Sequence, residues 1–206
     1  MRGRSWMIIG AVVGIGVGLG DVPFLAGAAR SLADTAQHLV ADGGRHLIAN
    51  VATSGAPQRL VLALTALIGV LLPGLTALLL VLAAIGSMRL RSVVALAIVA
   101  LGAVAYAYQP RGVATGVLVV ALAAGALAVA LTGPLVAAPL AGLAALIGTE
   151  FLPQLVTGHS SLALTNVGLF HQALTGNPGT PLVLQVVLLV IAAVPFAYAG
   201  RLILEP

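Results

Sequence analysis

Long apolar stretches without ionisable side chains constrain this chain more than any other feature. Segments 60–86, 92–109, 113–149 and 181–200 contain no Asp, Glu, Lys, Arg or His. About 20 consecutive apolar residues cross the hydrocarbon core of a bilayer as a helix. A helix satisfies its own backbone hydrogen bonds there, where no water is present to do so. The sequence therefore predicts an all-α, polytopic transmembrane bundle, formed as a single transmembrane domain over residues 1–206.

The charge content supports a membrane protein and argues against nucleic-acid binding. Only 7% of the residues are charged, whereas a soluble domain carries about 25%. The nine basic residues are all Arg and lie scattered along the chain, without the basic face that a nucleic-acid-binding protein needs. The abundance of Ala, Val, Leu, Gly and Arg indicates a bacterial chain, and therefore the bacterial inner membrane.

Six helical spans are predicted. They cover residues 6–29, 60–86, 92–108, 113–132, 134–153 and 181–200. Pro73 and Gly74 indicate a kink within the second span. With six spans both termini lie on the same side of the membrane.

The arginines predict which side that is. The side of the termini receives Arg2, Arg4, Arg89, Arg91 and Arg201, and the other side receives Arg30, Arg45, Arg59 and Arg111. The tight clusters directly flanking the spans favour cytoplasmic termini. Segments 30–59 and 154–180 then lie outside. The first places Leu32, Ala36, Leu39 and Val40 on one stripe, which is typical of a helix lying on the membrane interface. We expect interfacial helices in both of these outer loops.

An internal repeat relates the two ends of the chain. Residues 31–39 align with 161–169 at five identical positions of nine, and after an insertion in the first copy Pro73 aligns with Pro195. The first two spans with their outer loop thus correspond to the last two. Both copies run in the same direction, so the repeat is parallel, with a pseudo-rotation axis along the membrane normal.

Two acidic residues lie near the outer ends of spans. Asp21 and Glu150 occupy nearly equivalent positions in the two copies of the repeat. One interpretation is that they flank an outward-facing pocket; the other is that Asp21 caps a helix and Glu150 pairs with an arginine. Arg30 and Arg45 contact lipid headgroups or an anionic ligand in the first interpretation, and solubilise a polar helix face in the second.

Glycines recur at four-residue spacing in the first span. Gly10, Gly14, Gly16, Gly18 and Gly20 lie inside an apolar run with no preceding strand. This pattern is typical of a close-packing helix face rather than a phosphate-binding loop. It does not tell whether the partner is a helix of this chain or of another subunit.

No catalytic, metal or cofactor site is predicted. Characteristic catalytic motifs are absent, and the four histidines at 38, 46, 159 and 171 have no compact metal-ligand spacing. The favoured function is therefore a non-catalytic accessory subunit of a larger transport or cell-envelope assembly, with the lipid bilayer and other membrane subunits as partners. The alternative is a small transport or lipid-binding protein with an outward-facing site between its repeats.

Overall fold

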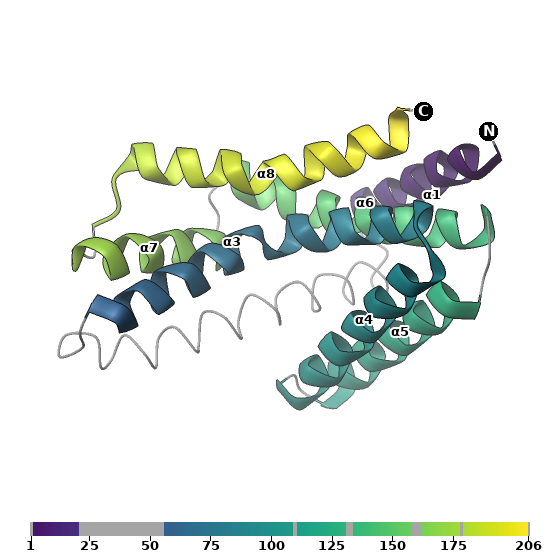
Figure 1. The fold of residues 1–206 in the computed structure, drawn as a ribbon, viewed down its shortest axis with the longest axis horizontal. Helices are drawn as coiled ribbons and strands as arrows, with labels where there is room; N and C mark the ends of the chain where they lie inside the picture. The colour runs from purple at the N-terminus through teal and green to yellow at the C-terminus, as the bar shows by residue number, and fades with distance from the viewer. Residues whose placement is uncertain are drawn as a thin grey trace.

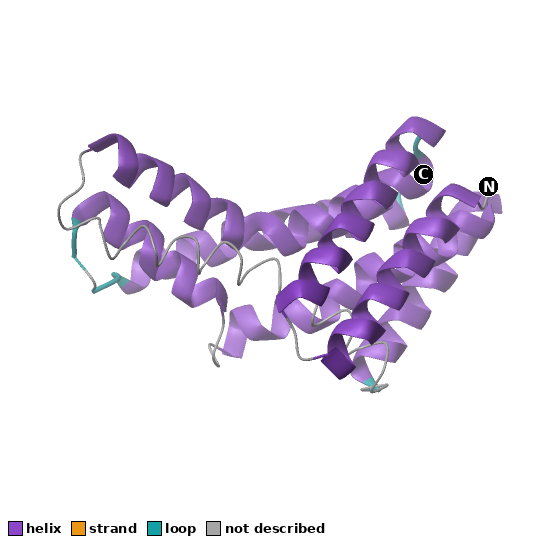
Figure 2. Cartoon of the chain, turned by 90° about the horizontal axis from the view of Figure 1, so that it is seen from below, coloured by secondary structure: helices purple, strands orange, loops and turns teal. Residues whose placement is uncertain are grey.

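The computed structural model describes residues 2–20, 56–108, 111–130, 134–157, 162–177 and 179–205. These residues form the helices α1 (Arg2–Leu19), α3 (Ala56–Ile85), α4 (Met88–Tyr108), α5 (Arg111–Ala130), α6 (Pro134–Thr157), α7 (Leu162–Thr175) and α8 (Leu182–Leu204). No strand occurs within these ranges (Figure 2). The all-α prediction is thus confirmed for the part of the chain that the structure describes.

Two of these helices are long and apolar enough to cross a membrane, judged by length and composition. They cover Arg59–Ile85 and Leu182–Leu204. Three other apolar stretches, Arg4–Leu19, Ala121–Ala130 and Leu135–Thr149, are shorter among the described residues. The two long spans coincide with the second and sixth predicted spans.

Four helices form the main body in two neighbouring pairs. α1 lies along α6, and α3 lies along α8, with α3 also packed against α6 (Figure 1). The core between them is lined by small and branched apolar side chains such as Val70, Val81, Leu140, Ala141 and Ala192. Small residues let the helix backbones approach closely, and the branched ones fill the space that remains.

The two termini lie at the same end of the molecule. Both views place the start of α1 beside the end of α8 (Figures 1 and 2). The turn between α3 and α4 lies at this end as well, whereas the start of α3, the end of α7 and the start of α8 lie at the opposite end (Figure 1). The helix ends that carry Arg4, Arg89 and Arg201 therefore lie at the same end of the molecule.

The α4–α5 hairpin packs chiefly on itself. Gly125 of α5 faces α4, where an added Cβ would come within 2.7 Å of Val99 Cγ2 and 3.2 Å of the Ala95 carbonyl oxygen. The hairpin diverges from the main body and remains close to it only near its base (Figure 1). Its outer side chains, such as Leu96 and Leu122, are exposed.

The structure differs from the sequence interpretation at α3 and α7. α3 is one uninterrupted helix that contains Pro73 and begins four residues earlier than expected. Segment 154–180, predicted as an outer loop with an interfacial helix, instead extends α6 to Thr157 and contributes α7, which packs along α3. Asn166 and Val167 of α7 are completely buried, so this helix belongs to the bundle.

Candidate functional site

The closest backbone contact in the main body joins α1 to α6 through glycines. Gly10 lies directly against Ala138, and a Cβ added to it would fall 2.7 Å from the Ala138 Cα. Gly14 lies against Gly142, and its added Cβ would fall 3.0 Å from the Gly142 Cα. Real Cβ atoms do not approach other backbone this closely, so only glycine permits this packing.

The partners along this contact show how the two helices run. Gly10 meets Ala138, Gly14 meets Gly142, and Gly18 meets Leu146 and Thr149. Partner numbers rise together, so α1 and α6 are parallel and in register over two turns. We refer to Gly10, Gly14 and Gly18 with their α6 partners as the glycine seam.

The remaining two glycines of the predicted packing face lie elsewhere. An added Cβ at Gly16 would meet nothing within 4 Å, and one at Gly20 would meet only the carbonyl oxygen of Gly16. Both residues are exposed. The single face expected from the sequence is therefore divided into a packed stripe and an open one.

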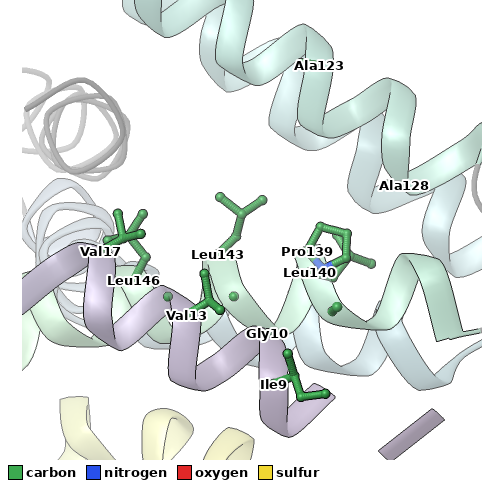
Figure 3. A pocket seen from close by; sticks show the side chains of 13 residues that line it. Ile9, Gly10, Val13, Val17, Ala123, Ala128, Pro139, Leu140, Leu143 and Leu146 are labelled. Atoms are coloured by element: carbon green, nitrogen blue, oxygen red, sulfur yellow. The ribbon is translucent and has the colours of Figure 1, made fainter. Parts of the chain in front are cut away.

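An apolar groove of about 430 Å³ lies on one flank of the glycine seam (Figure 3). We call it the α5-side groove. It is lined by Ile9, Gly10, Val13, Gly14 and Val17 of α1, by Ala138, Pro139, Leu140, Gly142, Leu143 and Leu146 of α6, and by Ala123 and Ala128 of α5. It follows from the divergence of the α4–α5 hairpin, which leaves α5 distant from α1.

A second apolar groove, of about 470 Å³, lies on the other flank of α1. We call it the α8-side groove. It is lined by Ala11, Ile15 and Leu19 of α1, by Ala144, Ala145, Gly148, Thr149 and Leu152 of α6, by Phe196, Ala199, Gly200, Ile203 and Leu204 of α8, and by Ala77 of α3. At its floor Phe196 stacks on Phe151 of α6, with ring centroids 5.8 Å apart.

The α8-side groove offers almost no hydrogen-bonding capacity. Thr149 is the one residue with a polar side chain among its lining residues, and its hydroxyl donates to the Leu146 carbonyl oxygen at 2.9 Å. The groove therefore fits an apolar ligand, because a polar one would lose its hydrogen bonds to water without replacing them.

A buried amide in α7 was not singled out by the sequence interpretation. Asn166 has no exposed surface, and within the described part of the chain neither its Oδ1 nor its Nδ2 has a hydrogen-bond partner. A buried polar group in this state costs stability. The signal was visible in the sequence as a lone amide within the apolar stretch 162–170.

The α7–α8 connection is held by local hydrogen bonds. The buried His171 places Nδ1 3.2 Å from the Asn177 carbonyl oxygen, and Gly176 closes α7 with a φ of 75°. The Asn177 side chain accepts from the backbone N–H of Gly179 at 2.9 Å. His171 thus helps to hold this turn.

The structure does not test the predicted outer pocket. Asp21, Arg30 and Arg45 lie outside the described residues, and for Glu150 only the helical backbone within α6 is described. The described ion pair joins Arg201 Nε to Glu205 Oε2 at 2.5 Å, at the exposed end of α8.

Comparison of the chain with protein-family models, with curated proteins and with solved structures finds no match.

Proposed function

We propose that this chain is a multi-pass integral membrane protein of a bacterial inner membrane that acts without catalysis, as a helical subunit of a larger transport or cell-envelope assembly. The observation that carries the proposal is the surface of α8. Apart from Gln185 and Arg201, the 23 residues of this helix are apolar or weakly polar, yet only 17% of its most apolar window is buried. An exposed apolar surface of this extent needs a non-aqueous surrounding.

The exposed large apolar side chains of α8 occur along most of its length. They are Leu182, Val183, Val186, Val187, Val190, Ile191, Val194, Tyr198 and Leu204. Removing these side chains from water would be favourable, but no part of the chain within the described ranges covers them. The hydrocarbon core of a bilayer supplies the required apolar environment along the whole helix.

The helix arrangement supports the six-span topology as part of this proposal. The first and fifth predicted spans correspond to α1 and α6, which are parallel, and the second and sixth correspond to α3 and α8, which also run in one direction (Figure 1). A parallel repeat requires this agreement in direction. The arginine-bearing helix ends lie together at the end that we assign to the cytoplasm.

The α4–α5 hairpin supports a role as a subunit. Its two helices bury Ala95 and Ala121 against each other but leave Val93, Leu96 and Leu122 exposed. Helices associate in membranes through close packing of such smooth surfaces. Among the described helices, this hairpin contacts the bundle near its base, which leaves exposed side chains such as Leu96 and Leu122 available to helices of a partner.

Site-specific crosslinking in native membranes tests the subunit role. A photoreactive side chain is placed at Leu96 or Leu122, and the same residue at the fully buried Val81 of α3 serves as the control. We expect crosslinks from the hairpin positions to one defined polypeptide, seen as a discrete mass shift. The buried control position should give only intramolecular products.

Two results would contradict the proposal at different levels. Extraction of the chain from membranes by alkaline carbonate would disprove membrane insertion. Retention in the membrane, with hairpin crosslinks to lipid alone, would disprove the subunit role while leaving insertion intact.

A specific observation favours a second candidate, a lipid-binding membrane protein. The α8-side groove is apolar, open and of a volume typical of ligand pockets. This groove lies between α1, α6 and α8.

A further inference from the structure

We propose that the α8-side groove binds one acyl chain of an anionic phospholipid, whose headgroup lies beside Arg201. This proposal rests on the membrane insertion proposed above and names a ligand and a site for it. The groove extends along α1 from Ala11 to Leu19, which is about 12 Å at the helical rise. Its shape is therefore elongated along the helices, as an extended acyl chain requires.

The groove is too narrow to be filled by a partner helix. α1 and α8 contact each other directly over part of their length. A helix with its side chains is about 10–12 Å across, so none can lie between two helices that already touch. An acyl chain can, because small residues such as Ala11, Ala145 and Gly200 form the walls.

The opening is particular to this side of the molecule. In the predicted repeat, α1 and α8 correspond to α6 and α3. The α3–α6 pair packs closely, whereas the α1–α8 pair is largely separated by the groove. The helix pair that corresponds to α1 and α8 in the repeat therefore packs closely. The opening between α1 and α8 is specific to that pair.

Charge beside the groove selects the headgroup. Arg201 lies between the groove residues Gly200 and Ile203 along α8, and its side chain is 64% exposed. Its ion pair with Glu205 is also exposed, and such pairs are easily exchanged for another anion. Arg4, in the first turns of α1, is exposed at the same end of the molecule. Anionic lipids are enriched in the cytoplasmic leaflet, to which we assign this end.

Photocrosslinking in vesicles tests the site. The full-length chain is reconstituted in phosphatidylcholine vesicles with a trace of phosphatidylglycerol that carries a diazirine in one acyl chain. We expect crosslinks, mapped by peptide mass spectrometry, to concentrate in residues 11–19, 144–152 and 196–204. Unlabelled phosphatidylglycerol should compete better than added phosphatidylcholine.

Glycine variants separate the groove from the general lipid-exposed surface. An added Cβ at Gly200 meets nothing within 4 Å, so Gly200→Leu introduces a side chain at this wall of the groove without a clash at Cβ. We expect the crosslinking yield to fall by about fivefold or more, because the displaced acyl chain loses its burial. Gly16→Leu is the matched control, since Gly16 has equally open surroundings but lines neither groove. Its yield should be unchanged.

Two further variants complete the test. Ala11→Phe fills the groove from the opposite wall and should reproduce the loss if Gly200→Leu folds poorly. Arg201→Gln should leave acyl crosslinks in place but reduce the preference for phosphatidylglycerol over phosphatidylcholine about fivefold.

Crosslinks spread evenly over α8, with unchanged yield in Gly200→Leu and Ala11→Phe, would overturn the proposal. A flotation assay of the same vesicles keeps this result distinct from a failure of membrane insertion, in which the wild-type chain would not float with the lipid.

Discussion

At the level of single residues, the absent side chains of Gly10 and Gly14 determine how closely α1 approaches α6. Each glycine lies against backbone of the opposite helix, at Ala138 and Gly142. A side chain on the opposite helix could rotate away from an added methyl group, but backbone cannot. The glycine seam is therefore sensitive to the smallest substitution.

Replacing Gly14 by alanine should destabilise the protein by about 1–3 kcal/mol, because the added Cβ overlaps the backbone at Gly142. Gly16→Ala places the same group in open space and should leave stability unchanged or raise it by up to about 1 kcal/mol. Denaturant titration in detergent, followed by far-ultraviolet circular dichroism, measures both. Equal effects of the two substitutions would refute the glycine seam.

The buried amide of Asn166 gives a second residue-scale prediction. Its polar atoms have no partners, so Asn166→Leu should keep or raise the free energy of unfolding by about 1–3 kcal/mol. The matched control is Asn177→Leu, at an exposed turn position where the lost hydrogen bond to Gly179 should cost about 1 kcal/mol. A clear loss of stability in Asn166→Leu would mean that the amide is hydrogen-bonded in the native protein, by water or by a ligand.

At the level of elements, the chain covers much less of α8 than of α3, with 17% against 44% of the most apolar window buried. α8 contacts α3 along one side. There, a Cβ added to Gly74 of α3 would lie 3.0 Å from the Ala192 carbonyl oxygen. The rest of its circumference is apolar and exposed. Its stability as a helix therefore depends on the surrounding medium more than on packing.

A charge at the middle of α8 should oppose membrane insertion. Val190→Arg places a cation near the centre of the helix, at an apparent cost of about 2.5–3.5 kcal/mol. Leu204→Arg is the control, since Leu204 is equally exposed, 62% against 61%, but lies at the helix end near Arg201. The inserted fraction, measured by resistance to alkaline extraction, should fall in the first variant and remain near wild type in the second. Equal extraction of both would argue against α8 as a span.

The sequence predicted the helices well and their contacts poorly, for a physical reason. Apolar runs of sufficient length require helices wherever they cross a membrane, and the predicted spans at 60–86 and 181–200 correspond to α3 and α8. Helix pairing depends on which small residues face each other. Gly10/Gly14 and Gly16/Gly20 have the same spacing in sequence, yet only the first pair is packed. Asn166 is visible in the sequence as a lone amide in an apolar stretch, but only the packing of α7 shows that its side chain is buried.

At the level of the whole molecule, the helices place the termini together at one end and the α7–α8 turn at the other (Figure 1). The chain has no Cys. A single introduced cysteine is therefore the only site that a maleimide labels, and its labelling reports on which side of the membrane that residue lies.

Cysteines at the two ends should be labelled from opposite sides of the membrane. Ser87 lies in the α3–α4 turn and Asn177 in the α7–α8 turn, and both are exposed. A membrane-impermeant maleimide added to intact cells should label Asn177→Cys strongly and Ser87→Cys weakly, and both after permeabilisation. Labelling of both from the same side would contradict the topology, and a reversed pattern would contradict its orientation.

The glycine seam also has a consequence for biosynthesis. α1 leaves the ribosome before its partner α6, and the two are separated by roughly 130 residues of translation, on the order of 10 s at ordinary elongation rates. In the proposed membrane topology, the smooth face of α1 lies in the bilayer without α6 during that interval. Lipid, an insertase or a partner subunit must cover this face of α1 until α6 is synthesised. Arresting the ribosome before α6 would trap α1 in contact with that factor.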